Sequence, residues 1–224
     1  VGATVPEAGV AAASGGNHGA AVAYAARVLG VPARIFVPSI SSPAKVARIA
    51  SYGATIAQEG ANYQECLGFC EAYAKQSGAM DIHAYNTEVT LNGPGTLARE
   101  LEEQAPELDT VLIAVGGGGL IGGMASWYQS RVKIIGVEPA TCNALHAALG
   151  AGRPVAVKPA GVAADSLGAS SAGTLMFPIA QRHVDRVILL SDDDIRNAQR
   201  FLWTASQIVT EPGGAAAFAS LLSG

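Results

Sequence analysis

The segment SGGNH, residues 14–18, places a serine, an asparagine and a histidine around two glycines, where an alanine-rich helix pattern begins. The first turn of a helix leaves about four backbone N–H groups without partners and carries a partial positive charge, so it can bind an anion. Ser14 and Asn17 could hold such a ligand, or they could simply cap the helix, as these residue types commonly do. The segment alone leaves both roles open.

A second segment, VGGGGLIGG, contains four consecutive glycines, Gly116–Gly119, between an apolar strand pattern and another helix pattern. Successive residues without a Cβ let neighbouring backbone N–H groups converge on one anion, which is the geometry that holds a phosphate. An ordinary tight turn needs only one or two glycines. The sequence therefore predicts a phosphate site at this loop.

The same glycines also fit a dinucleotide-binding pattern. Gly117, Gly119 and Gly122 satisfy G-x-G-x-x-G, and Glu138 closes the next strand, where such a fold places its ribose-binding acid. The glycine motif alone is weak, and this interpretation gives SGGNH no role. A nicotinamide-binding module, or a non-catalytic ligand-binding module, is the alternative from another functional class.

Other groups of reactive residue types favour structural roles. Cys66 and Cys70 lie four apart in a helical stretch, and with Cys142 they make an odd count, so we expect reduced, partly buried thiols. Ser191 and the acids at 192–194 fit the start of a helix, where a serine caps and acids complement the helix dipole. We predict no metal site.

The elements that must position these residues alternate along the chain. Strand patterns occur in GVAAA, ARIFVP, ATIAQ, MDIHAY, DTVLIAV and VKIIGVE, and helix patterns occur over residues 17–29, in SPAKVARIASYG, NYQECLGFCEAYAKQSG and GTLARELEEQA, and behind the glycines. Such alternation with short Gly and Pro punctuation predicts a mostly parallel, doubly wound α/β fold. Residues 150–173, rich in Pro, Gly and Ser, are expected to form a long loop over a functional surface.

The composition excludes several classes of protein. The chain has 224 residues, of which 50% are hydrophobic and 14% charged, so it can bury a core without disulfides. Its net charge of -4 offers no basic surface for nucleic acid. The sequence shows neither a membrane-spanning apolar stretch nor a signal-peptide pattern. We expect a cytoplasmic protein that binds neither nucleic acid nor membranes.

Together these segments resemble one family. SGGNHGAAVAYAARVLGVPARIFVPSISSPAKVARIASYGATI is similar to a Ser-x-Gly-Asn-His segment and the following helix in the fold-type II pyridoxal-phosphate enzymes, specifically the serine/threonine dehydratases and serine racemases. VGGGGLIGG, IIGVEP, GVAADSLGASSAGTL and EPGGAAAFASLLSG resemble later blocks of that family in the same order. The resemblance implies two doubly wound parallel-sheet domains of the tryptophan synthase β-like type. The small, substrate-side domain would span residues 9–86, and the large, cofactor-binding domain residues 1–8 and 87–224.

The resemblance also implies functional residues. The four glycines would bind the cofactor phosphate, Asn17 would hydrogen-bond the 3-oxygen of the pyridine ring, and the SGGNH segment would hold the substrate carboxylate. Cofactor binding is thereby assigned to Asn17, Gly116, Gly117, Gly118, Gly119, Leu120, Ser166 and Glu211, and substrate binding to Ser14, Gly15, Gly16, Asn17 and His18. His18 could instead be a packed helix residue, and Glu211 an acid at a helix start.

Several positions depart from the family pattern. The Schiff-base lysine of the family lies upstream of Ser-x-Gly-Asn-His, and the serine at the pyridine nitrogen lies beyond the block ending LLSG. We therefore expect a chain truncated at both ends, inactive alone. Ser166 stands where the family has a glycine, and Pro94 where relatives often have glutamine. Members that bind a cation use an aspartate where this chain has Ala144, although their glutamate is present as Glu138.

The implied function of the complete protein is dehydration and deamination of L-threonine or L-serine to a 2-oxo acid and ammonia, by a homodimer. A β-replacement synthase or a serine racemase is the alternative within the same cofactor class. Racemases of the family carry a serine at the position of Gly15, and it protonates the Cα carbanion. Because racemisation needs a proton donor on each face of that carbanion, we expect elimination to be faster than epimerisation.

Overall fold

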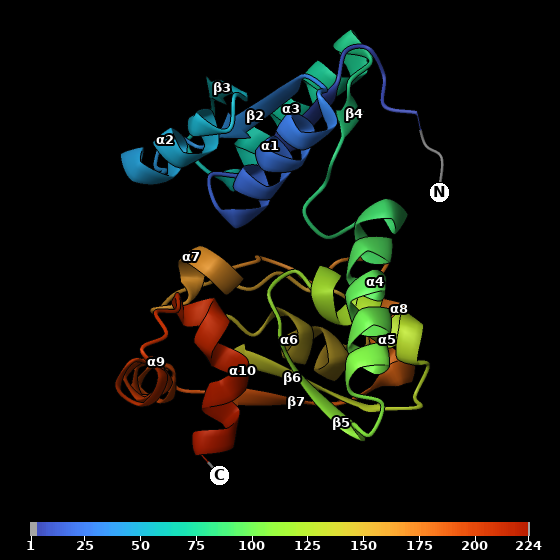
Figure 1. Cartoon of the computed structure of the whole chain (residues 1–224), viewed down its shortest axis with the longest axis vertical. Helices are drawn as coiled ribbons and strands as arrows, with labels where there is room; N and C mark the ends of the chain where they lie inside the picture. Colours follow the sequence, from blue (N-terminus) through green and yellow to red (C-terminus); the bar gives the residue numbers. More distant parts are fainter. Residues whose placement is uncertain (1–3, 224) are drawn as a thin grey trace. The chain divides into compact units, whose positions relative to one another are not determined.

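The computed structural model describes residues 4–223, and the chain divides into two compact units between Ala84 and Tyr85 (Figure 1). Each unit contains its own parallel sheet, which confirms the predicted α/β class with two parallel-sheet domains. The assignment of residues 1–8 to the larger domain stays a prediction, and its first three residues lie outside the described part of the chain.

The first unit is built on a four-stranded sheet in the order β3–β2–β1–β4, with all neighbours parallel. Its elements are β1 (Val10–Ala13), α1 (Asn17–Leu29), β2 (Ala33–Val37), α2 (Pro43–Ser51), β3 (Thr55–Gln58), α3 (Tyr63–Ser77) and β4 (Met80–Asp81). Successive side chains of a strand point to opposite faces. Val10 and Ala12 accordingly pack with α1 and α2, whereas Ala11 and Ala13 pack with α3. Helices cover both faces of the sheet (Figure 1).

The strand order reverses at β1, which lies between β2 and β4. In open parallel sheets, ligands bind beyond the carboxyl ends of the strands where the order reverses. The turn that leaves β1 is at this point, and it contains Ser14, Gly15 and Gly16. The fold therefore places the SGGNH turn, residues 14–18, where a ligand site is expected.

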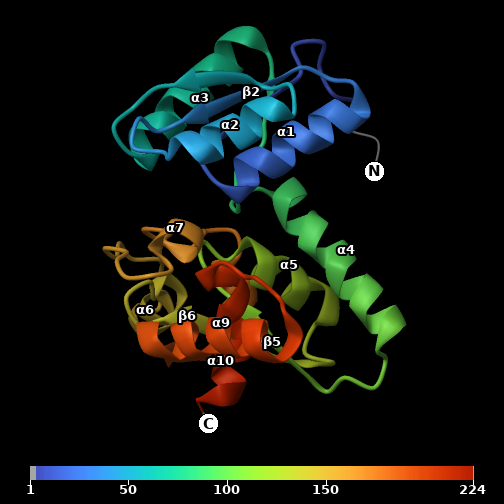
Figure 2. The same cartoon turned by 60° about the vertical axis from the view of Figure 1, so that its left-hand side comes forward.

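The second unit is built on the parallel sheet β5–β6–β7. Its elements are α4 (Glu88–Gln104), β5 (Thr110–Ala114), α5 (Gly119–Tyr128), β6 (Lys133–Pro139), α6 (Ala144–Ala151), α7 (Ala164–Leu167), α8 (Phe177–His183), β7 (Val184–Leu190), α9 (Asp192–Ser206) and α10 (Pro212–Leu222). The helices α4, α5, α6 and α8 contribute to one apolar cluster, and α9 and α10 to another. Figure 2 shows α9 and α10 beside each other.

Local signals set the ends of several helices. The helix α1 spans Asn17–Leu29, as the sequence predicts, and Gly30 ends it in the left-handed conformation. Gly78 ends α3 in the same way. At α9, Ser191 and Asp194 form a reciprocal capping box with the backbone. The acids at 192–194 thus begin a helix, as expected.

The helix α4 is longer than the sequence pattern indicated. The expected helix covered residues 95–105, but α4 begins at Glu88 and continues through Pro94. The Thr87 hydroxyl accepts the Thr90 N–H at 3.2 Å and so starts the helix well before the proline. The Pro94 ring packs against α5, because its Cβ lies 2.8 Å from the place that a Cβ on Gly123 would take. Close helix packing therefore accommodates a proline that the local pattern disfavours.

Candidate functional site

The SGGNH turn presents unpaired backbone donors at the start of α1. Within residues 4–223, nothing accepts a hydrogen bond from the backbone N–H groups of Gly15, His18 and Gly19. The Gly16 N–H donates to the Ser14 hydroxyl at 3.1 Å. Unpaired N–H groups at a helix start attract an anion, so this turn fits a carboxylate.

The His18 ring has a structural contact of its own. Its Nε2 lies 2.8 Å from the carbonyl oxygen of Ile82, just beyond β4, and donates to it. Burial lowers the pKa of His18, which favours the neutral imidazole. The ring therefore links α1 to the segment after β4, as the packed-residue alternative implied, while the backbone N–H of His18 stays available to a ligand.

Ser41 lies against the SGGNH turn, although the sequence analysis did not identify it. Its hydroxyl occupies the space that a Cβ on Gly15 would take. The strands β1 and β2 are parallel neighbours, so the turns after them meet at one edge of the sheet. The local signal was weak, because Ser41 belongs to a serine- and proline-rich stretch behind a strand, and such stretches are common in loops.

The glycine loop, residues 116–119, connects β5 to α5. Gly118 has φ +94°, a left-handed conformation that favours glycine. In the described chain, the N–H groups of Gly117, Gly118, Gly119 and Leu120 donate to no protein acceptor. Gly118 and Gly119 are nevertheless buried, and buried N–H groups are normally paired. Four adjacent unpaired donors therefore fit a phosphate group.

Neighbouring residues of the second unit pack closely around this loop. The Tyr85 ring occupies the space that a Cβ on Gly117 would take, and the Met176 side chain does the same at Gly118. A Cβ on Gly116 would lie 3.3 Å from the backbone of Leu167. Protein packing thus requires glycines in this loop, independently of any requirement set by a ligand. Neither Tyr85 nor Met176 was identified from the sequence.

Glu211 precedes α10, and Ser166 of α7 contacts the start of that helix. The Ser166 hydroxyl accepts the Gly213 N–H at 3.0 Å and donates to the Ala163 carbonyl at 3.3 Å. Glu211 is the N-cap residue, but its side chain makes no capping hydrogen bond. The serine that replaces the family's glycine therefore stabilises this helix start. Contact of either residue with a cofactor stays a prediction.

Glu138 is buried, and its carboxylate binds backbone N–H groups. Its two carboxylate oxygens accept the N–H groups of Leu145 and His146, each at 2.8 Å, at the start of α6. Burial raises the pKa of Glu138 to about 7, and these two hydrogen bonds act in the opposite direction. Among the described residues, no group of three or more His, Cys, Asp or Glu side chains is placed to hold a metal ion.

The three cysteines are free thiols and are buried. Burial raises the pKa of Cys66 to about 11 and that of Cys70 to about 12. The Cys142 thiol donates to the Ala160 carbonyl at 3.2 Å. These contacts are typical of unreactive, structural thiols, which is the role that the sequence favoured.

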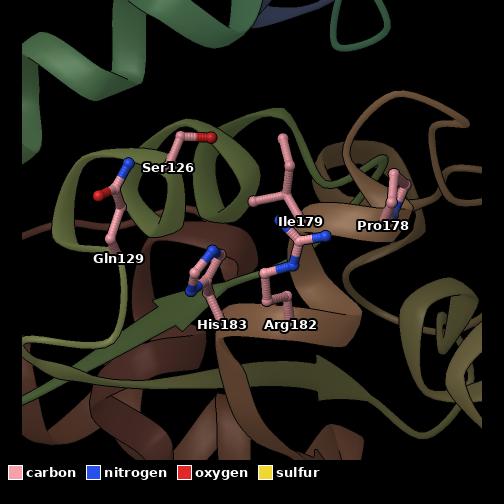
Figure 3. Close-up of a pocket in the computed structure, with 6 residues that line it drawn as sticks. All are labelled: Ser126, Gln129, Pro178, Ile179, Arg182 and His183. Atoms are coloured by element: carbon pink, nitrogen blue, oxygen red, sulfur yellow. The ribbon is translucent and has the colours of Figure 1, made fainter.

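A cavity of about 360 Å³ lies at the opposite end of α5 from the glycine loop (Figure 3). Residues of α5, α8 and the turn after α5 line it, namely Ser126, Gln129, Pro178, Ile179, Arg182 and His183. No residue of the predicted site is among them, so this cavity is separate from the glycine loop.

Almost the whole chain is similar to known proteins. Residues 3–224 match the family described as "Pyridoxal-phosphate dependent enzyme". The chain is 36% identical to phenylserine dehydratase from Ralstonia pickettii, covering 97% of this chain and 67% of that protein. It is 34% identical to L-threonine ammonia-lyase from Geobacter sulfurreducens, covering 96% of this chain and 54% of that protein. The chain therefore belongs to the pyridoxal-phosphate-dependent enzymes.

Solved structures agree with this assignment. Maize serine racemase superposes with a TM-score of 0.91 at 33% identity, covering 96% of this chain and 66% of that chain. The threonine deaminase from T.th. superposes with a TM-score of 0.91 at 33% identity, covering 99% of this chain and 74% of that chain. These neighbours confirm the predicted fold type.

Family membership confirms pyridoxal phosphate as the cofactor and sets the nicotinamide alternative aside. The residues present fit this group, because the glycine loop offers four adjacent unpaired N–H groups for its phosphate. The chain spans 54% of the length of the Geobacter relative and 67% of the Ralstonia relative. Over residues 4–223, no helix is both long and apolar enough to cross a membrane.

Proposed function

We propose that the complete protein containing this chain dehydrates and deaminates L-threonine or L-serine, giving a 2-oxo acid and ammonia. The observation that carries the proposal is a pair of helix starts with unpaired N–H groups, one at the SGGNH turn and one at the glycine loop. The reaction presents two anions, the substrate carboxylate and the cofactor phosphate. Relatives named phenylserine dehydratase and L-threonine ammonia-lyase support this reaction class.

In the proposed mechanism, the chain binds and orients both anions. The N–H groups of Gly117 to Leu120 would hold the phosphate, and those of Gly15, His18 and Gly19 would hold the substrate carboxylate. As the family resemblance implies, Asn17 would hydrogen-bond the ring 3-oxygen. When bound, pyridoxal phosphate supplies an electron sink for the pair left at the substrate Cα. Because these donors are fixed by helix starts, they need little reorganisation when charge develops.

The proposed reaction converts the substrate to a 2-oxo acid and ammonia. Loss of the Cα proton and the β-hydroxyl removes one water, and later hydrolysis returns one water and releases ammonia. The net change therefore converts the hydroxy amino acid to a 2-oxo acid without an external oxidant.

We also propose that the Schiff-base lysine lies outside these 224 residues. The lysines of the chain are Lys45, Lys75, Lys133 and Lys158, in α2, in α3, at the start of β6 and in the loop before α7. None belongs to the SGGNH turn or to the glycine loop. Borohydride reduction of the complete protein, followed by peptide mass spectrometry, should modify none of these four. Cofactor attached to any of them would overturn the proposal.

The assay of function measures several products from one reaction. The complete protein is incubated with L-threonine or L-serine, and the 2-oxo acid, ammonia and D-serine are quantified together. We expect equal amounts of 2-oxo acid and ammonia, with D-serine formed far more slowly because Gly15 carries no hydroxyl. D-serine formed at a comparable rate would identify a racemase. Turnover only of O-acylated serine with an added nucleophile would identify a β-replacement synthase.

Two properties of the complete protein rest on the resemblance alone. We propose that it is a cytoplasmic homodimer. Light scattering during gel filtration tests the assembly, and fractionation of the native cell tests the location.

A further inference from the structure

Ser41 fills the place of the side chain that Gly15 lacks. Its hydroxyl occupies the Cβ position of residue 15, and its own Cβ lies 2.9 Å from that position. The ring of Pro38 lies 3.6 Å away. A side chain at position 15 would therefore collide with Ser41, and a hydroxyl already lies beside the turn without one.

Backbone hydrogen bonds fix the positions of the two turns at the carboxyl ends of β1 and β2. Ala13 is paired with Phe36, and the Ser14 N–H donates to the Phe36 carbonyl at 2.9 Å. The Ser41 N–H donates to the Pro38 carbonyl at 3.0 Å and closes the turn after β2. The position of the hydroxyl is thus fixed by the sheet register and by a closed turn.

The Ser41 hydroxyl has no hydrogen-bond partner within residues 4–223, and the side chain is half-buried. Its neighbours Ser14 and Ser42 each accept a backbone N–H group, a contact that positions those two hydroxyls locally and that Ser41 lacks. A hydroxyl with a free proton therefore lies next to the unpaired N–H groups of the SGGNH turn. All of these groups are donors, which suits an anion.

We propose that Ser41 is a further substrate-contacting residue, whose hydroxyl donates a hydrogen bond to the carboxylate of the amino-acid substrate. The inference rests on the proposed function, because it takes the SGGNH turn as the carboxylate site. It extends that site to a residue from the turn after the neighbouring strand. Hydrogen bonds to charged groups are strong enough for their loss to weaken binding about tenfold.

The test uses the complete protein loaded with pyridoxal phosphate. For Ser41→Ala we expect KM for L-threonine or L-serine to rise about tenfold while kcat changes less than about threefold. Calorimetric titration with L-alanine, which has no β-hydroxyl to eliminate, should show the same loss of affinity. Ser39→Ala is the matched control, because Ser39 is exposed in the same loop, and it should change neither value.

Moving the hydroxyl from position 41 to position 15 tests this contact specifically. Ser41→Gly should weaken L-alanine binding, and the double variant Gly15→Ser with Ser41→Gly should recover it by supplying the hydroxyl from the other turn. Gly15→Ser alone should bind poorly, since the two side chains overlap. Ser41→Cys retains the approximate size with a weak donor and should behave as Ser41→Ala, even if the alanine variant fails to fold.

The outcomes distinguish a failure of the Ser41 proposal from a failure of the proposed function. Unchanged KM and unchanged L-alanine affinity in both Ser41→Ala and Ser41→Cys would overturn the role of Ser41 while leaving the enzyme assignment intact. A native protein that neither binds nor turns over any of these amino acids would instead overturn the proposed function.

Discussion

At the scale of single residues, Glu138 shows how burial and capping compete. The carboxyl group is fully buried, and although two N–H groups of α6 bind it, burial still raises its pKa from 4.5 to about 7. A raised acid pKa means that folding favours the protonated form. The stabilising contribution is therefore complete below pH 4.5 and is lost as pH rises through about 7.

A pH series of urea unfolding tests this property of Glu138. Between pH 4.5 and about pH 8, we expect the free energy of unfolding of the native protein to fall by up to about 3 kcal/mol more than that of the Glu138→Gln variant. Glu107→Gln, at an exposed position, should retain the native pH dependence. Parallel pH curves for the native protein and Glu138→Gln would contradict the expectation.

Ser166 is a second residue whose role is capping. Ser166→Ala removes the acceptor of the Gly213 N–H at the start of α10, so we expect the free energy of unfolding to fall by about 1 kcal/mol. Ser220→Ala, later in the same helix, removes a hydroxyl that donates only to the Ala217 carbonyl and should cost less. Equal losses in urea unfolding would show that Ser166 has no special role.

At the scale of elements, the glycine loop combines a left-handed backbone conformation at Gly118 with close packing. Gly118→Ala would place a Cβ at φ +94° and against the Met176 side chain. We expect the dissociation constant for pyridoxal phosphate to rise at least about tenfold, because the adjacent N–H groups would be displaced. Cofactor fluorescence titration measures the constant.

Gly68→Ala is the control for this substitution. Gly68 lies inside α3, away from any proline, and a Cβ there would meet nothing within 4 Å. Alanine should leave cofactor affinity unchanged and stabilise the helix by roughly 0.5–1 kcal/mol. Equal cofactor affinity in both variants would mean that the loop does not bind the phosphate.

The elements also differ in how far sequence predicts them. The strands and helices up to β6 are separated by glycine, proline or polar residues, so their order could be predicted. The helix α8 and strand β7 were not predicted, because β7 begins at Val184 directly after His183 with no punctuation. Asp185 and Arg186 also place two charged residues in succession within the strand. Such a pattern does not alternate as a half-buried strand does.

The candidate site, too, could be predicted only in part from the sequence. The glycine loop and the SGGNH turn could be predicted, because each is one continuous segment with an unusual composition. Ser41, Tyr85 and Met176 could not, because no local motif marks them and each is brought to its loop from a different part of the chain. Only the sheet register and helix packing make them neighbours of the predicted residues.

At the scale of the whole molecule, each unit has its own apolar clusters. Ile35 is fully buried in the first unit, whereas Ile40 is 78% exposed. Ile35→Ala should lower the free energy of unfolding by roughly 2–5 kcal/mol. It should increase amide hydrogen exchange across residues 4–84 more than across residues 85–223. Ile40→Ala should leave exchange unchanged, and an equal increase in both units for Ile35→Ala would show that they unfold together.

The central position of β1 has a consequence for synthesis on the ribosome. β1 and the SGGNH turn emerge before the other strands of their sheet, but β1 pairs with β4, and the His18 ring binds the Ile82 carbonyl. Both partners are translated much later, and contacts between distant parts of a chain form slowly. The nascent chain can pair β1 with β2 first, but it cannot fix the start of α1 until Ile82 has left the exit tunnel. The SGGNH turn precedes α2, β3 and α3 in the chain, yet it is among the last parts of its unit to reach the native geometry.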